Sequence, residues 1–217
     1  MAKPGRSLSV RVLGATVIPE FELSDFHESP DEPVNPFLRS VVRLPVRKAE
    51  QRIPVAVVSN NYMLVQHAEV GNRCISAIAA AGVDLSGLRC EIGLSELDEW
   101  MNLRLYLPEC YSYRARNGEQ LDLRVEAFNS VDGSARLTIL SGWFRLVCSN
   151  GLVIGKSLLE LRDIHNPSLD LVKIEDAIAK AILHGKDDQA RLEQWQNCRV
   201  DRKAIAAGVD GAVRDHH

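Results

Sequence analysis

LRCEIGLSELDEWMNLRLYL, residues 88–107, decides the fold class of this 217-residue chain. Apolar and polar side chains alternate on both sides of the polar turn SELDE, first around Cys90 and Ile92 and then around Leu103 and Leu105. A period of two residues is typical of strands that bury one face. The stretch therefore predicts an antiparallel hairpin with one face toward the core and the other toward water.

The same alternation continues toward the C-terminus. Residues 121–127 alternate again, and NSVDGS (residues 129–134) contains the Asp-Gly pair that favours a tight turn. The next alternating run begins at Ala135 and is expected to continue into WFRLVC after a bend at Ser141-Gly142. The middle of the chain is therefore predicted to be a meander of antiparallel strands.

Helical periodicity is found on both sides of the meander. In residues 66–81 the apolar side chains return every three or four positions, and Gly82 is placed to end the helix. PSLDLVKIEDAIAKAILHG shows the same spacing, with Ser168 or Asp170 as the N-cap and Gly185 as the stop. A second polar helix around DDQARLEQWQNC is expected to pack back on it.

These patterns predict an α+β fold: a curved antiparallel meander sheet packed against a helix, with C-terminal helices. We divide the chain into an N-terminal acidic, Pro-containing arm (residues 1–38), an α+β core domain (residues 39–165) and a C-terminal helical extension (residues 166–217). The arm begins with a candidate strand, LSVRVL, and then becomes acidic and rich in proline, so we expect a mobile or draped segment. An acidic arm that mimics nucleic acid or shields a basic groove is the alternative.

Overall composition excludes several classes of protein. A net charge of −3 with 25% charged residues is ordinary for a globular chain and does not indicate a polyanionic partner for the whole surface. No apolar run approaches the roughly 20 residues of a membrane-spanning helix, and the N-terminus lacks the apolar core of a leader, so we expect a cytoplasmic protein with no membrane association. Five scattered cysteines without a Cys-x-x-Cys pair indicate reduced thiols and no metal site, and we expect no cofactor.

One local stretch is basic. It lies between two β-branched runs, VVRLPV and IPVAVVS, and either binds phosphate or keeps an edge strand from pairing with other sheets. On the predicted meander, arginines are interleaved with aromatic residues, which either stack on bases or fill the core. The candidate nucleic-acid-binding residues are Arg43, Arg47, Lys48, Arg52 and Arg145, and the candidate stacking residues are Tyr106, Tyr111, Tyr113, Trp143 and Phe144.

RLVCSNGLVIG, residues 145–155, contains the candidate for a reactive thiol. A Cys148 nucleophile requires a base nearby in space, and the candidates are His67, His165 and His184. The Asn-Gly pair that follows the cysteine is typical of a turn, and a cysteine on a strand is usually packed. We therefore favour a structural role for this stretch. His165 itself is explained adequately as a residue of the loop IHNP before a helix.

GLVIGKS, residues 151–157, resembles the end of a phosphate-binding loop. However, Gly151 is one residue too close to Gly155 to complete Gly-x-x-x-x-Gly-Lys-Ser, and that spacing lets the loop wrap its amides around the phosphates. No other catalytic signature occurs in the chain. We therefore predict no catalytic residues and favour a protein that is not an enzyme.

Two stretches carry a family resemblance. NSVDGSARLTILSGWFRLVCSNGLVIG has Asn-Ser-x-Asp-Gly-Ser before an apolar strand and Arg-x-Val-Cys-Ser-Asn-Gly after it, and VAVVSNNYMLVQHAEV has a Val-Ser-x-x-Tyr-x-x-Val-Gln run. Over residues 40–165 the chain resembles the phage- and plasmid-like proteins grouped as domain of unknown function 932, with the N-terminal arm and the terminal helices outside the resemblance. The resemblance implies a setting in phages, plasmids or integrated elements, and it implies no catalytic residues.

The leading hypothesis is a phage- or plasmid-type accessory protein without enzymatic activity that binds nucleic acid, above all single-stranded DNA, and assembles as a homo-oligomer. The order of strand, helix, meander and closing helix is similar to that of single-strand annealing proteins, although no motif is shared. The rival hypothesis is a protein-interaction module that uses the acidic arm or the terminal helices to engage a host or phage protein. A cysteine hydrolase built on Cys148 is the third class.

Overall fold

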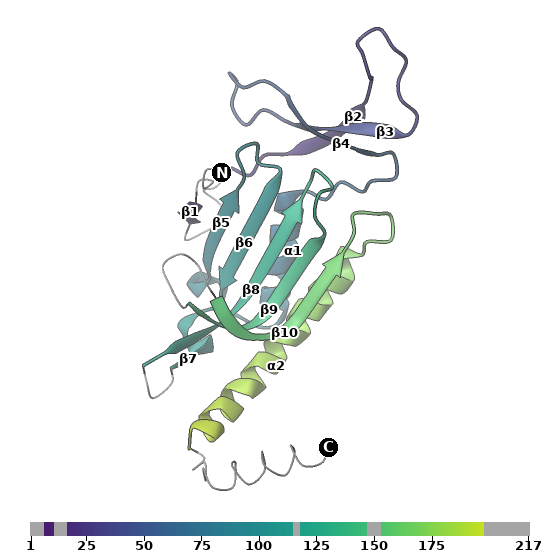
Figure 1. Cartoon of the computed structure of the whole chain (residues 1–217). Coiled ribbons are helices and arrows are strands. Elements are labelled where there is room, and N and C mark those ends of the chain that lie inside the picture. The colour runs from purple at the N-terminus through teal and green to yellow at the C-terminus, as the bar shows by residue number, and fades with distance from the viewer. Residues whose placement is uncertain (1–6, 11–16, 115–117, 147–152, 198–217) are drawn as a thin grey trace, which may run out of the picture.

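The chain folds into two antiparallel sheets and two α-helices, which confirms the predicted α+β fold. Figure 1 shows the large sheet in the middle, both helices on one of its faces, and the small sheet beyond one of its ends. The computed structural model describes residues 7–10, 17–114, 118–146 and 153–197, with side chains at all of them except residues 7–10, 145–146, 153–157 and 195–196.

The large sheet is the predicted meander. It consists of β1 (Ser7–Val10), β5 (Arg89–Leu94), β6 (Trp100–Tyr106), β7 (Ser112–Arg114), β8 (Gln120–Ser130), β9 (Leu137–Leu146) and β10 (Val153–Asp163). The strands follow the order β1-β5-β6-β8-β9-β10, and β7 pairs with β8 outside this path. Every pair is antiparallel, so the candidate strand near the N-terminus joins the sheet at its edge.

The hairpin predicted from residues 88–107 is formed by β5 and β6. Cys90 pairs with Leu105 and Ile92 pairs with Leu103. All four side chains are buried in the main core. Since alternate residues of a strand point to opposite faces, the polar residues between them lie on the face away from the helices.

At Ser141-Gly142, where the sequence predicts a bend, the irregularity of the sheet lies on the neighbouring strand. β9 runs through both residues without interruption. In β10 the register shifts between Ser157 and Leu159, opposite Gly142 and Ser141. An extra residue on one strand bends the pair locally, so the sheet curves at this level.

The helix α1 (His67–Ala80) matches the prediction, including its end. Gly82 has φ 75°, a left-handed conformation that glycine adopts without strain. Its N–H donates to the Ala79 carbonyl at 2.9 Å, and the N–H of Val83 donates to the Ile78 carbonyl at 3.3 Å. This pair of bonds is a Schellman motif, which satisfies carbonyls that the helix end leaves free.

The helix α2 (Leu171–Asn197) is continuous, so the prediction of a stop at Gly185 followed by a second helix is wrong. The helix begins where predicted, because Asp170 Oδ1 accepts the N–H of Val172 at 3.0 Å. Gly185 is buried against β8, and a Cβ at this position would lie 2.7 Å from Leu123 Cδ2. The glycine therefore allows the helix to approach the sheet closely. A close-approach glycine and a stop glycine look alike in the sequence.

The small sheet consists of β2 (Phe21–Asp25), β3 (Leu38–Arg43) and β4 (Ile53–Ser59) in that order. β3 and β4 match the two β-branched runs. β2 lies in the segment expected to be a mobile or draped arm, and a strand paired with β3 forms there instead. Phe21 is 4% exposed and packs with Val41, Val58 and Val131, so apolar burial anchors the strand despite its acidic surroundings.

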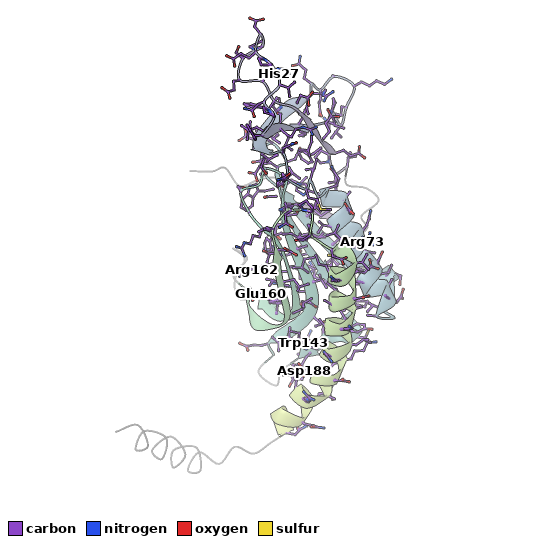
Figure 2. The ribbon with its side chains drawn as sticks, turned by 90° about the vertical axis from the view of Figure 1, so that its right-hand side faces the viewer. His27, Arg73, Trp143, Glu160, Arg162 and Asp188 are labelled. Carbon is purple, nitrogen blue, oxygen red and sulfur yellow. The ribbon has the colours of Figure 1, made fainter. Side chains whose placement is uncertain are left out.

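The main core lies between the large sheet and the two helices. Arg73 of α1, which is labelled in Figure 2, also pairs with Glu175 of α2, with 3.2 Å between Nη1 and Oε2. Within the described part of the chain, no helix is long and apolar enough to cross a membrane. Since α1 and α2 share one core, the C-terminal helix is needed to cover the sheet. The helix residues in this core include Val70, Cys74, Ile78, Ile174, Ile178 and Ile182.

Candidate functional site

The basic stretch noted in the sequence forms the end of β3 and the loop between β3 and β4. Carboxylates neutralise part of its charge. The side chain of Arg43 is 14% exposed, with Nε 2.8 Å from Asp98 Oδ2 and Nη2 3.5 Å from Glu50 Oε2. Arg52 pairs with Glu22 of β2. These two arginines therefore have protein partners for their charge, which reduces what they offer to an external phosphate.

Arg47 and Lys48 remain as exposed cations of this basic stretch. Neither has a carboxylate partner among the described residues. The fifth candidate, Arg145, lies on β9 with its backbone paired to Ile154, and its side chain is outside the described residues. Of the four candidates whose side chains are described, Arg47 and Lys48 are therefore the exposed cations without a carboxylate partner.

Most of the predicted stacking residues are part of the protein interior. Tyr111, Tyr113 and Trp143 belong to the main core, and Phe144 is 8% exposed. The alternative that such aromatics fill the core is therefore correct for them. Tyr106 is half-buried on the polar face of the sheet, where the guanidinium carbon of Arg89 lies 3.7 Å from its ring centroid. The protein itself covers this ring face.

The thiol hypothesis falls mostly outside the described structure. Cys148 is not among the described residues, so its structural role stays a prediction. Residues 155–157 lie within β10, and an extended strand does not form the compact turn that a phosphate loop needs. Among the candidate bases, His184 is exposed on α2. His67 and His165 come together in a different polar cluster.

Three loop segments meet at the end of the large sheet that faces the small sheet. They are residues 62–67, which lead into the start of α1, residues 129–136, which comprise the end of β8 and the turn to β9, and residues 164–166 after β10. The first two segments belong to the stretches that carry the family resemblance. The turn is tied to the neighbouring hairpin, because the Val131 N–H donates to the Glu99 carbonyl at 2.9 Å.

A buried hydrogen-bonded chain lies where these segments meet. Asn129 Nδ2 donates to the Val65 carbonyl at 3.0 Å and faces His67 Nδ1 at 2.9 Å. Asn129 Oδ1 lies 2.9 Å from His165 Nε2. The Tyr62 ring stacks on His165 with 5.4 Å between the ring centroids. Polar groups buried in this way are held in place because each needs its partner.

The two histidines of this hydrogen-bonded chain, His67 and His165, are uncharged near neutral pH. Burial lowers the pKa of His67 to about 4, although the bond to the Asp98 carbonyl and the charge of Glu99 act in the opposite direction. Burial also lowers the pKa of His165, against the opposing charges of Asp132 and Asp163. Removal of water disfavours the imidazolium form in both cases.

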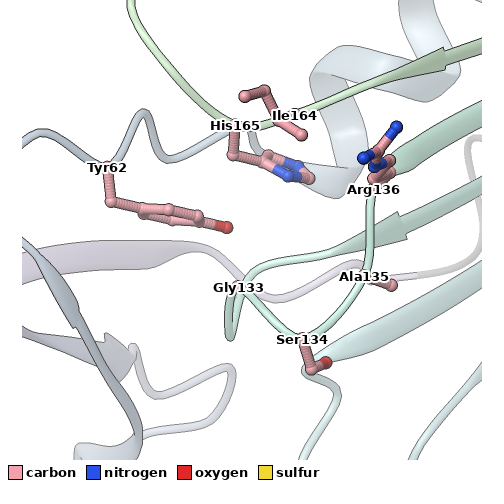
Figure 3. Close-up of a pocket in the computed structure, with 7 residues that line it drawn as sticks. All are labelled: Tyr62, Gly133, Ser134, Ala135, Arg136, Ile164 and His165. Atoms are coloured by element: carbon pink, nitrogen blue, oxygen red, sulfur yellow. The ribbon is translucent and has the colours of Figure 1, made fainter.

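A pocket of about 350 Å³ opens beside His165 (Figure 3). The turn that forms one wall is braced by Asp132, whose Oδ1 accepts from the hydroxyl and the N–H of Ser134 at 2.5 and 3.0 Å. Arg136 follows in this wall and is exposed, with no carboxylate partner among the described residues. The lining residues are Tyr62, Gly133, Ser134, Ala135, Arg136, Ile164 and His165.

The lining groups are suited to binding an anionic, partly aromatic ligand. A guanidinium donates to phosphate or carboxylate, and the imidazole and hydroxyl add neutral hydrogen bonds. Among the described residues, no cluster of three or more His, Cys, Asp or Glu is arranged to hold a metal ion.

Fold and site together define an α+β protein with an antiparallel meander sheet, two helices on one face and a polar pocket among the loops at one end. The chain belongs to the family described as domain of unknown function (DUF932), which it matches over residues 54–216. No curated protein and no solved structure matches it. The match begins in β4 and includes α2, so it extends beyond the C-terminal limit of the resemblance seen in the sequence. The shared core explains why α2 belongs with the sheet.

Sequence reasoning missed the pocket. Asn129 was noted only as part of a turn, and Arg136 was not singled out. His165 was considered as a base for Cys148 and as a loop residue before a helix. The available signal was that two stretches singled out for the resemblance contain Tyr62 and Asn129. Nothing in the sequence placed these stretches side by side.

Proposed function

We propose that this protein binds single-stranded nucleic acid, with single-stranded DNA as the first candidate, and that Arg136 contacts a phosphate of the strand. The observation that best supports the proposal is an exposed guanidinium without a carboxylate partner at a pocket that also contains imidazole, hydroxyl and aromatic groups. Arginine binds phosphate through two parallel N–H donors. The pocket volume falls within the roughly 300–1,000 Å³ of small-ligand sites, which suits one nucleotide unit.

Ion pairing distinguishes Arg136 from other arginines. Among the described arginine side chains, Arg47, Arg114 and Arg136 have no carboxylate within ion-pair distance. Of these three, Arg136 lines the pocket. An unpaired charge keeps its full attraction for an external anion. The arginines that do have a carboxylate partner are Arg39, Arg43, Arg52, Arg73, Arg89, Arg104, Arg124, Arg162 and Arg191.

Arg47 and Lys48 extend the proposed surface. Their loop is tied to the turn between β5 and β6 by the ion pair of Arg43 with Asp98, and this turn is the neighbour of the pocket turn. A strand that leaves the pocket along this end of the sheet therefore passes these two cations. Since carboxylates lie along the same path, we expect binding to be moderate in strength and sensitive to salt.

Arg136→Ala is expected to weaken binding of a labelled oligothymidylate about tenfold at low salt, because one arginine–phosphate contact is lost. The slope of log affinity against log salt concentration should fall by about 1. Fluorescence anisotropy titrations at several salt concentrations measure both quantities. The proposal includes assembly as a homo-oligomer and an origin in a phage or plasmid. Light scattering on the same samples tests the oligomer.

Arg114→Ala is the matched control. Arg114 is exposed and lacks a carboxylate partner, but it lies on β7 beside the opposite end of β8 from the pocket. This variant should keep the affinity of the wild type. Equal losses in the two variants would show that only general charge matters. Absence of binding by the wild type at low salt, or binding that ignores salt, would refute the proposed function.

Protein binding through the loop between β2 and β3 is the second candidate function. In this loop Phe37 is 75% exposed and Val34 is 45% exposed, next to the acidic residues Glu28, Asp31 and Glu32. An exposed aromatic side chain near carboxylates suits a partner surface that is partly apolar and basic. Figure 2 shows His27 of this loop at the end of the molecule far from α2, so the loop is accessible.

Phe37→Ser is expected to abolish recovery of such a protein partner in a pull-down from nuclease-treated host lysate, because an aromatic anchor contributes much of an interface. Val17→Ser is the control, since Val17 is 68% exposed but lies outside the loop. It should retain the partner. A partner that disappears on nuclease treatment is bridged by nucleic acid, and it would count for the first function and against the second.

A further inference from the structure

The orientation of the Asn129 side chain is decided by the carbonyl of Val65. The side-chain atom that lies 3.0 Å from this carbonyl must be the amide nitrogen, because two oxygen acceptors at that distance repel each other. The amide oxygen is therefore the atom that faces His165 Nε2. Asn129 is 1% exposed, so the protein alone satisfies its amide.

This orientation determines the tautomer of His67. The Asn129 amide donates to Nδ1, so Nδ1 carries no proton and the ring proton is on Nε2. Nε2 donates to the Asp98 carbonyl at 2.9 Å, which agrees with this assignment. A second proton on Nδ1 would place two donors against each other. His67 is therefore the neutral, fixed end of the chain.

The same argument determines the tautomer of His165. Asn129 Oδ1 can only accept, so His165 Nε2 carries the proton, and Nδ1 of the neutral ring is an acceptor. Around this ring, Asp132 and Asp163 favour an added proton. Burial acts in the opposite direction and has the larger effect. The other histidine of the hydrogen-bonded chain, His67, is already neutral.

We propose that His165 Nδ1 accepts a hydrogen bond from a base N–H of the nucleotide whose phosphate is held by Arg136. In Figure 3 the His165 ring lies between Tyr62 and Arg136. The side chains of His165 and Arg136 line the same pocket. His165 is thus a specificity-determining residue that requires a donor on the ligand. This inference rests on the proposed function, because it assigns the second contact of the same nucleotide.

Thymine provides a direct test because its only ring donor is the N3–H. Oligothymidylate whose bases are methylated at N3 is expected to bind the wild type about tenfold more weakly than the unmodified strand at neutral pH, since one hydrogen bond is lost and an acceptor is left unpaired. His165→Leu should remove most of this difference between the two strands, because leucine has no acceptor. Since leucine also leaves Asn129 Oδ1 without its donor, circular dichroism checks that the variant is folded.

The pH dependence has a defined sign. Burial places the pKa of His165 below its usual value of about 6.5. As the pH falls through this pKa, Nδ1 becomes a donor, and the affinity for unmodified oligothymidylate should drop about tenfold. A residue that contacts phosphate instead would gain affinity with its added positive charge. The ¹⁵N shifts of the unbound wild type, measured by NMR at neutral pH, should show the His165 proton on Nε2.

Three results would overturn the inference: equal affinity for both strands, tighter binding at acid pH, or a proton on Nδ1 of the neutral ring. In each case salt-dependent binding at neutral pH would persist, so the proposed function would survive. Failure of the proposed function is recognised separately, because the wild type would then not bind unmodified oligothymidylate at low salt at any pH.

Discussion

Arg124→Met is expected to lower the free energy of unfolding by about 4 kcal/mol, because it leaves a buried carboxylate without its closest cation. The side chain of Arg124 is 2% exposed, and its Nη2 lies 2.5 Å from Oε1 of Glu126, which is 8% exposed. The guanidinium carbon also lies 4.7 Å from the Phe144 ring centroid and 5.3 Å from that of Tyr106. Denaturant unfolding followed by circular dichroism measures the loss.

Combining Arg124→Met with Glu126→Gln separates lost charge pairing from lost packing. The double variant removes both charges, and methionine can fill the space between the two aromatic rings. It should recover about 2 kcal/mol relative to the single variant. Arg104, whose Nε lies 3.6 Å from Glu126 Oε1, keeps a second carboxylate in Glu91 at 4.0 Å. A double variant no more stable than the single variant would show that packing, and not the ion pair, holds Arg124.

Asn129→Leu is expected to lower the free energy of unfolding by about 4 kcal/mol, although leucine has nearly the same volume. The change leaves the Val65 carbonyl and His165 Nε2 without their partner, and each buried unsatisfied group costs about 1–3 kcal/mol. Asn72→Leu is the control, since Asn72 is exposed on α1. A loss of similar size in the control would contradict the assignment of this cost to the buried chain.

Acidification provides a second measurement, which compares the wild type with Asn129→Leu. The pKa of His67 is about 4 in the folded protein and near 6.5 in the unfolded chain, so the unfolded chain binds more protons between these values. Wild-type stability should therefore fall as the pH is lowered from 6.5 to 4, by up to about 3 kcal/mol. In Asn129→Leu the amide no longer opposes a proton on Nδ1, so this dependence should be shallower. Identical slopes would show that burial alone lowers the pKa of His67.

The strands and the first helix could be predicted because their cause is local. Two patterns indicate which side of each element is apolar: the alternation around Cys90 and Leu105, and the helical spacing before Gly82. Burial of that side forms the core. The alternation also assigned Arg124 and Glu126 correctly to the polar face. It did not indicate that this face is itself buried at Arg124, because curvature of the sheet and the position of Phe144 decide that.

The candidate site could not be predicted, since it depends on contacts between distant parts of the chain. Pairing of Trp100 with Ser130 and the bond from Val131 to Glu99 bring the pocket turn beside the first hairpin. Local spacing carries no information on such a juxtaposition. The segment that provides His165 reaches the pocket only after β10 has run alongside β9 at the edge of the sheet.

The sequence by itself determined the α+β class, the meander and the helix over residues 67–80, because a repeating apolar pattern specifies the buried face of each element. Only the tertiary structure decided which cations remain available. Arg43 and Arg52 were equal in sequence to Arg47 and Lys48, and they differ because folding brings Asp98 and Glu22 to them. Charge neutralisation depends on distance in space, so the accessible cation of the pocket, Arg136, could be recognised only once the chain was folded.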